Sequence, residues 1–295
     1  MQSFQTTFSP TSDSELYGVY IWIQHVVGSL YPLTQHIEVA LRNAIDMEAR
    51  RRFGYKWWRK PEFNGPDKVK LQDNFAKAKT KLDSDWEKKE RLRLSIWYPT
   101  PLPTPTPVWN HDQIIGATDF STWEFILNKQ FAHPTNLSGT THLWPDSMSL
   151  SFRRFDLLHV DSKKARTQLL NLVREIRQYR NRLYHHDKIW SSPHPFMTAP
   201  MVVQVINAKI DKMELILKVI DPRLHSVLEK TGVLANARRV CSMNDLDIYR
   251  FAHDEAPMTR RKKRILRSVT GRARSTKATQ AWTYAGSLYG IYQIR

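Results

Sequence analysis

Residues 163–190 read KKARTQLLNLVREIRQYRNRLYHHDKIW, and this stretch decides the fold class. Apolar residues recur in it at steps of three and four, a spacing that places them on one stripe of an α-helix. Asp161 and Ser162 precede the stretch, and both residue types are typical helix caps. We therefore predict a long amphipathic helix that runs to about Tyr184. Its apolar stripe consists of Leu169, Leu172, Val173, Ile176 and Leu183.

The same periodicity predicts helices along most of the chain, and no convincing alternation of apolar and polar residues indicates a strand. Pro32 is expected to end or redirect the first long helix, because proline removes a backbone donor. The sequence therefore predicts an all-α protein. The predicted helices cover residues 16–31, 34–53, 67–94, 120–131, 148–157, 201–220 and 222–232.

Composition divides the chain into two expected parts. Residues 1–220 form a helical domain with a charged helical insertion at about 66–96. A loop at 98–107 follows the insertion, and its five prolines exclude regular helix or sheet. Residues 221–295 form a helical extension that ends in a basic tail.

The charge of the chain points to a polyanionic partner. Lys and Arg number 45 against 28 acids, a formal charge of +17, and residues 256–295 contain ten Lys or Arg and no acid. RNA is the expected partner, although a solvated and partly disordered tail explains the same composition. The candidate RNA-binding residues are Arg260, Arg261, Lys262, Lys263, Arg264, Arg267, Arg272 and Arg274.

Two further features concern the compartment. No apolar run approaches the roughly 20 residues of a membrane-spanning helix, and the N-terminus lacks the pattern of a signal peptide. The single cysteine, Cys241, suits a reducing environment. We expect a cytoplasmic protein with no membrane partner.

Arg180 is the unusual residue of the decisive helix. It lies four residues after Ile176 and three before Leu183, so it falls within the apolar stripe. A guanidinium on that side is costly unless it is paired or binds a ligand. A structural ion pair with Glu38 is one explanation, and a binding role is the other.

The residues that follow Arg180 favour the binding role. Arginine can hold a phosphate, histidine can move protons near neutral pH, and asparagine can orient either group. Arg180, Asn181, His185 and His186 therefore provide the groups for RNA cleavage by internal transfer, without a metal or other cofactor. Spacing alone leaves the choice between His185 and His186 open. On a straight helix His185 points away from Arg180, so the helix must end or bend near Leu183, or a second subunit must complete the site.

Three segments resemble a known family. RNRLYHHD at 180–187 resembles the R-x4-6-H motif of the HEPN ribonuclease superfamily, and its double histidine is similar to the Abi-like, abortive-infection branch. IEVALRNAIDMEARRRFGYKWW at 37–58 resembles the first conserved segment of that branch. STWEFILNKQF at 121–131 resembles the third. The three segments occur in the expected order.

This resemblance implies a HEPN-like helical bundle that pairs as a homodimer with a composite active site. It implies RNA cleavage to a 2′,3′-cyclic phosphate and a 5′-hydroxyl, by a toxin or antiphage effector that a protein or noncoding RNA antitoxin can restrain. Arg180, Asn181, His185 and His186 match the motif. The supporting residues that match the first segment are Glu38, Arg42 and Asn43.

Competing interpretations stay open. A non-catalytic protein of the same fold could bind a structured or small noncoding RNA, and the motif could serve nucleotide transfer or be a target of modification. A metal site built from His185, His186, Asp187 and His194 is disfavoured, because adjacent histidines point in different directions. Trp57 and Trp58 could stack on bases, but a core or lid position is favoured.

Overall fold

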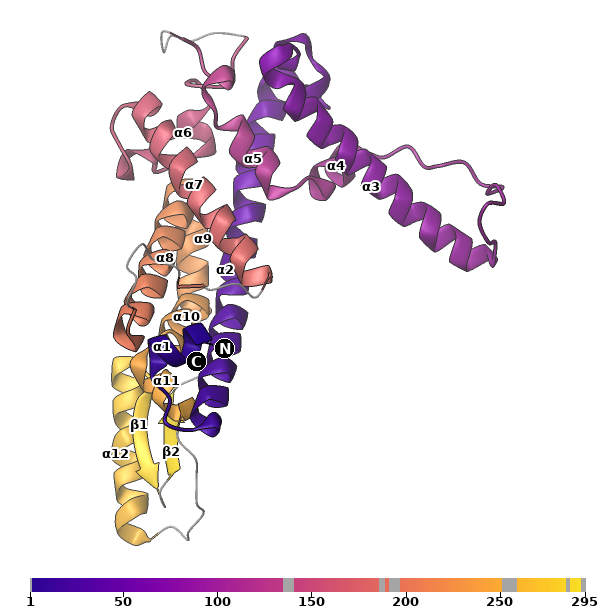
Figure 1. Cartoon of the computed structure of the whole chain (residues 1–295). Coiled ribbons are helices and arrows are strands. Elements are labelled where there is room, and N and C mark those ends of the chain that lie inside the picture. Colours follow the sequence, from indigo (N-terminus) through magenta and orange to yellow (C-terminus); the bar gives the residue numbers. More distant parts are fainter. Residues whose placement is uncertain are drawn as a thin grey trace. The chain divides into compact units, whose positions relative to one another are not determined.

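The computed structural model describes residues 2–134, 141–185, 189–190, 197–250, 259–284 and 287–292. The chain is 74% helical, which confirms the all-α prediction (Figure 1). Within the described ranges, no helix is long and apolar enough to cross a membrane.

The helices form two compact units, and neither unit is one continuous segment. Unit 1 contains residues 1–37, 178–218 and 222–295, and unit 2 contains residues 38–177 and 219–221. Helices α2 (Asp13–Phe53) and α7 (Ser162–Tyr184) contribute residues to both units. Neither unit coincides with residues 1–220 or 221–295.

Unit 2 has an aromatic core. Its other helices are α3 (Val69–Leu94), α4 (His111–Ala117), α5 (Phe120–Ile126) and α6 (Met148–Ser151). Trp57 and Trp58 are buried, and the ring of Trp58 stacks on Phe75 with the centroids 4.2 Å apart. The core position predicted for this tryptophan pair is confirmed, and its burial removes both rings from any contact with bases.

The charged insertion and the proline-rich loop form one structure in unit 2. The predicted helix at 67–94 is confirmed by α3, and the loop after it has no regular structure. Trp109 Nε1 donates a hydrogen bond to Asp83 Oδ1 (2.6 Å), and Arg91 donates to the carbonyl of Thr100 (2.7 Å). The loop therefore returns along α3, as Figure 1 also shows.

Unit 1 contains the remaining helices. They are α1 (Gln2–Phe8), α8 (Ala199–Ile220), α9 (Pro222–Lys230), α10 (Val233–Val240), α11 (Met243–Arg250) and α12 (Arg260–Thr276), although the last two residues of α8 belong to unit 2. Trp22 on α2 is fully buried, and its Nε1 donates to the carbonyl of Val240 (2.9 Å). Cys241, the next residue, is also buried. Gly18 lies so close to α11 that a Cβ there would be 1.7 Å from the carbonyl oxygen of Tyr249.

The expectation that Pro32 interrupts the first helix is wrong. Helix α2 runs through Pro32 without a break. A proline inside a helix costs about 3 kcal/mol. Leu30, Leu33 and Ile37 flank it and are fully buried, and each gains roughly 1.5–3 kcal/mol from burial. The packing of the apolar face therefore outweighs the lost hydrogen bond.

The expectation that the chain has no strand is also wrong. Strands β1 (Gln280–Tyr284) and β2 (Ser287–Ile291) form an antiparallel pair in which Trp282 is opposite Tyr289. Trp282 is buried while its neighbours Ala281 and Thr283 are exposed, the alternation expected of a half-buried strand. This alternation spans only a few residues within a basic segment, which makes it a weak sequence signal.

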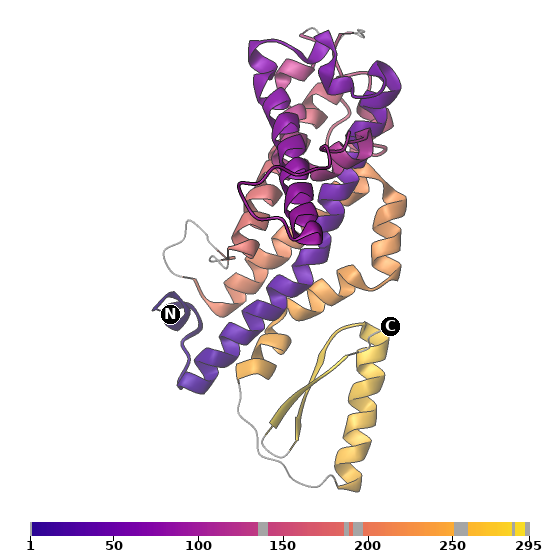
Figure 2. The ribbon, with the colours of Figure 1, turned by 90° about the vertical axis from the view of Figure 1, so that its right-hand side faces the viewer.

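The basic tail begins with a folded helix. Helix α12 packs its apolar side, Leu266 and Val269, against Trp282 and Ile291 of the hairpin. Figures 1 and 2 both show α12 beside the two strands. The tail is therefore ordered over most of its length, which answers the question left open by its composition.

Candidate active site at the end of helix α7

Helix α7 begins and ends where the sequence predicts. Asp161 caps its first turn, since its Oδ1 accepts a hydrogen bond from the backbone N–H of Lys164 (2.8 Å). The helix ends at Tyr184, and the backbone N–H of His185 donates to the carbonyl of Asn181 (3.0 Å). Leu172 of the predicted stripe is half-buried. The other four residues are fully buried, namely Leu169, Val173, Ile176 and Leu183.

Arg180 is half-buried and lies against an aromatic ring. Its Cζ is 4.6 Å from the centroid of the Tyr184 ring, a cation–π contact one turn along the helix. The Tyr184 hydroxyl accepts a hydrogen bond from Gln35 Nε2 (2.5 Å), and its ring lies 5.1 Å from that of Tyr31. These contacts fix the ring that supports the guanidinium.

Tyr184 is the residue that the sequence reasoning missed. Partial burial, together with a hydrogen bond to Tyr31, raises the pKa of the Tyr184 phenol. The group is therefore neutral at physiological pH and can donate or accept a hydrogen bond. The signal was present in the sequence, because Arg180 and Tyr184 are spaced i,i+4 and must be neighbours on a helix.

Asn181 and His185 both have exposed side chains. Helix α7 ends at Tyr184, but the backbone N–H of His185 still donates to the carbonyl of Asn181 in the i to i−4 pattern of a helix. The predicted end of the helix near Leu183 is confirmed, whereas the approach of His185 to Arg180 stays a prediction. His186, Asp187 and His194 lie outside the described residues.

The three supporting residues lie on α2 within unit 2, whereas Arg180 belongs to unit 1. Glu38 is half-buried and Asn43 is exposed. Arg42 donates to the carbonyl of Gly116 on α4 (3.4 Å).

The rest of the 37–58 segment has a structural role. Asp46 Oδ1 accepts hydrogen bonds from Trp57 Nε1 (2.7 Å) and from His111 Nε2 (2.9 Å). His111 is fully buried, and its Nδ1 accepts from the backbone N–H of Lys56 (3.1 Å). These hydrogen bonds fix the tautomer of the imidazole, and its burial keeps the ring out of contact with any substrate. The segment therefore holds the end of α2 against the aromatic core.

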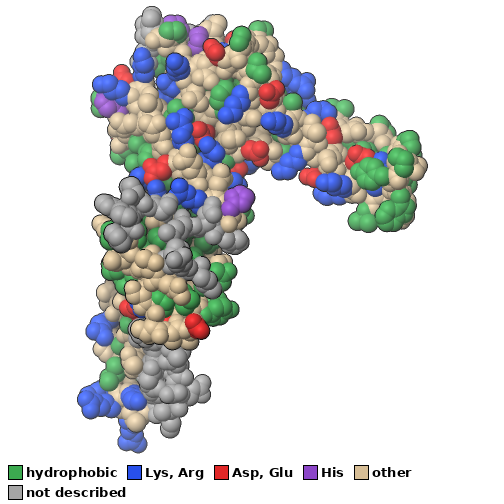
Figure 3. All heavy atoms as spheres, in the orientation of Figure 1, with side chains coloured by type: hydrophobic (Ala, Val, Ile, Leu, Met, Phe, Trp, Pro, Cys, Tyr) green, Lys and Arg blue, Asp and Glu red, His purple; other side chains and the backbone are tan. Residues whose placement is uncertain are grey.

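The eight candidate RNA-binding residues all lie on α12. Seven are exposed, and Lys262 is half-buried. Basic side chains are visible around this helix in the space-filling view (Figure 3). Val269 and Ala273 are the buried residues of this helix, and its exposed surface carries these cations among small polar residues and Ile265.

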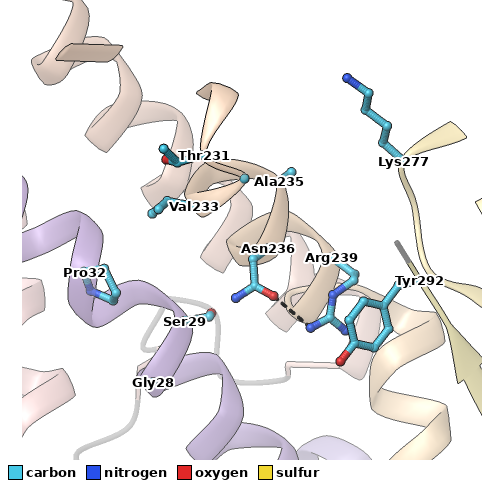
Figure 4. Close-up of a pocket in the computed structure, with 11 residues that line it drawn as sticks. Gly28, Ser29, Pro32, Thr231, Val233, Ala235, Asn236, Arg239, Lys277 and Tyr292 are labelled. Atoms are coloured by element: carbon cyan, nitrogen blue, oxygen red, sulfur yellow. Dashed lines mark hydrogen bonds between the residues drawn. The ribbon is translucent and has the colours of Figure 1, made fainter. Parts of the chain in front are cut away.

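Unit 1 also contains a pocket of about 310 Å³ lined by residues of α2 and α10, by the turn that precedes α10, and by Lys277 and Tyr292 (Figure 4). Arg239 is the cation at the centre of the pocket, and other side chains of the protein already bind its guanidinium. The guanidinium donates to Asn236 Oδ1 (2.9 Å) and to the buried Asp245 (2.9 Å), and it stacks on Tyr292 at 3.7 Å. These contacts give Arg239 a structural role.

Comparisons of the chain with protein-family models, curated proteins and solved structures found no match. In the part of the chain that the structure describes, no group of three or more His, Cys, Asp or Glu side chains is arranged to hold a metal ion.

Proposed function

We propose that this protein is a metal-independent endoribonuclease of the HEPN type that acts as a toxin or antiphage effector in the cytoplasm. The observation that carries the proposal is the end of α7, where a guanidinium held against Tyr184 precedes an exposed histidine by five residues. Such a pair combines an anion-binding group with a proton-transfer group in a position that RNA can reach.

In the proposed reaction, the ribose 2′-oxygen attacks the adjacent phosphorus and the bond to the 5′-oxygen breaks. The 2′-oxygen loses its proton to a base, and the departing 5′-oxygen gains one from an acid. His185 serves as one of these two groups, and Arg180 stabilises the charge that develops on the phosphate oxygens. Asn181 orients the pair, and His186 is the second candidate for proton transfer.

A homodimer would bring two copies of the motif to one composite cleft and so supply both the acid and the base. RNA is the substrate in this proposal, and a protein or noncoding RNA antitoxin restrains the enzyme. Growth arrest on expression of the wild-type chain, relieved by Arg180→Ala, is the expected behaviour of a toxin.

The test is RNA cleavage by purified protein in excess chelator, with the products identified by mass spectrometry. Arg180→Ala and His185→Ala are each expected to slow cleavage by about 100-fold or more, the usual contribution of such groups. Arg182→Ala is the matched control, because Arg182 is exposed on the same turn. Full activity of either site variant, with its fold intact by circular dichroism, rules out the mechanism.

A second candidate is a non-catalytic RNA-binding protein of the same fold, and the exposed cations of α12 favour it. Tight binding of RNA without any cyclic-phosphate product would select this function over cleavage.

A further inference from the structure

A second pocket, of about 280 Å³, lies within unit 2 at the start of α7. Four basic side chains line it, and none of the described lining residues is acidic; the four are Lys129, His133, Lys163 and Arg166. A pocket with this charge attracts an anion.

Arg166 distinguishes this pocket from surface charge. Only 5% of Arg166 is exposed, and its guanidinium donates to the carbonyl of Leu127. No carboxylate among the described residues forms an ion pair with it, and burial lowers the pKa of this guanidinium. Buried cations are normally paired or bind an anion. Arg239 in the first pocket has its carboxylate partner, Asp245, whereas Arg166 has only a neutral carbonyl.

The start of helix α7 contributes little by itself. Ser162 and Lys163 line the pocket, but the Asp161 carboxylate already accepts from the first turn of the helix. The side chains of Arg166, Lys163 and Lys129 must therefore hold the anion. Lys129 and Lys163 are both exposed and can close on a ligand from solvent.

The other wall of the pocket is apolar. Ala132, Pro134, Trp144 and Pro145 line it. A volume of about 280 Å³ lies at the lower end for small-ligand sites, which suits one nucleoside with its phosphate and not a longer segment. An apolar wall beside a cationic one matches a flat base attached to a charged group.

We propose that this pocket binds a 5′-phosphorylated nucleoside, either a free mononucleotide or the 5′-terminal nucleotide of an RNA strand. Arg166, Lys163 and Lys129 hold the phosphate, and the base lies against the wall formed by Pro134 and Pro145. The site involves none of the residues that we assign to cleavage, so it stands whether or not the protein is a ribonuclease.

The test is calorimetric titration of the full-length protein with AMP, adenosine and inorganic phosphate. AMP is expected to bind, and the other two ligands about tenfold more weakly or worse, because each lacks one half of the recognised group. Adenosine or phosphate that binds as tightly as AMP would overturn the assignment, as would no binding of AMP.

Substitutions at the pocket provide the second measurement. Lys163→Glu is expected to weaken AMP binding about tenfold or more through lost charge-assisted contacts. Lys164→Glu is the matched control, because Lys164 is exposed on the same turn and does not line the pocket; it should change affinity by about threefold at most. Equal effects of the two variants would contradict a specific site. Both positions are exposed, so neither substitution threatens folding, as an Arg166 variant could.

Short RNAs distinguish the two sources of the ligand. In the His185→Ala background, chosen to suppress the proposed cleavage, a 5′-phosphorylated trinucleotide that competes with AMP identifies an RNA end as a ligand. Failure of that RNA to compete, while AMP binds, identifies the free nucleotide.

Discussion

The guanidinium of Arg180 lies over the ring of Tyr184, with Cζ 4.6 Å from the ring centroid. Both residues are on α7 at a spacing of four, so the backbone of a single helical turn sets the geometry of this contact and no loop takes part. The ring, which Gln35 holds through the hydroxyl, acts as a platform for the cation.

Two substitutions of Tyr184 distinguish the contribution of the ring from that of the hydroxyl. Tyr184→Leu removes the cation–π contact, worth about 0.5–1 kcal/mol at such a site, and is expected to slow single-turnover RNA cleavage by roughly two- to fivefold. Tyr184→Phe keeps the ring and should retain more of the rate. An equal loss in the two variants would show that the hydroxyl, which both lack, matters and that the ring does not.

The buried Asp46–His111 pair is expected to stabilise the fold. Asp46→Ala leaves Trp57 Nε1 and His111 Nε2 without their acceptor, at about 1–3 kcal/mol for each group. The midpoint of urea unfolding should fall accordingly. Asp112→Ala is the control, since 81% of that side chain is exposed, and it should change the free energy of unfolding by about 0.5 kcal/mol or less.

Two glycines of α2 should respond in opposite directions to alanine. Gly18→Ala places a Cβ 1.7 Å from the carbonyl oxygen of Tyr249, and such overpacking costs about 1–3 kcal/mol or more. Gly28→Ala meets nothing within 4 Å and should stabilise the helix by up to about 1 kcal/mol. Thermal unfolding measures both changes, and a neutral Gly18→Ala would contradict the close contact with α11.

The cations of α12 are expected to set the salt dependence of RNA binding. Replacing four exposed members, Arg260, Lys263, Arg264 and Arg267, by alanine should reduce the slope of log affinity against log salt by about 0.7 for each lost phosphate contact. The control removes four exposed lysines of α3, namely Lys77, Lys81, Lys88 and Lys89. Equal slopes for the two variants would mean that only net charge matters.

The reactivity of the Cys241 thiol reports whether the protein is folded. Burial raises its pKa to about 12, above the value of about 8.5 for a free thiol. A raised pKa in the folded state means that this group favours folding below pH of about 8.5 and loses that contribution as the pH rises toward 12. Iodoacetamide at pH 8 should modify Cys241 in urea but not in the native protein, as mass spectrometry can verify.

The periodicity of apolar residues was sufficient to predict most helices. A helix that buries one apolar stripe needs apolar residues at steps of three and four, and this spacing can be seen in the sequence. The extent of α7, from its cap at Asp161 to Tyr184, follows from that repeat. Local rules failed where tertiary packing decides the outcome. Pro32 is an example, since only the burial of its neighbours explains why α2 continues, and no local signal reports that burial.

The site was partly predictable for a similar reason. Residue chemistry and spacing singled out Arg180, Asn181 and His185, and the i,i+4 relation to Tyr184 could have been read from the same helix. The pocket around Arg166 could not, because Lys129 and His133 come from one segment and Lys163 from another, and only the fold brings the two segments together. Arg166 itself lies three residues before Leu169 and seven before Val173, on the apolar side of α7, so the spacing argument that singled out Arg180 could have indicated its burial.

The burial of Cys241 has a practical consequence for work on this protein. The sequence contains one cysteine, and its side chain is 1% exposed, so the native surface offers no thiol to a maleimide dye. A cysteine introduced at an exposed position such as Ser275 on α12 becomes the sole attachment point. Single-site fluorescence can then follow the arrival of RNA at the basic helix without removing the natural cysteine.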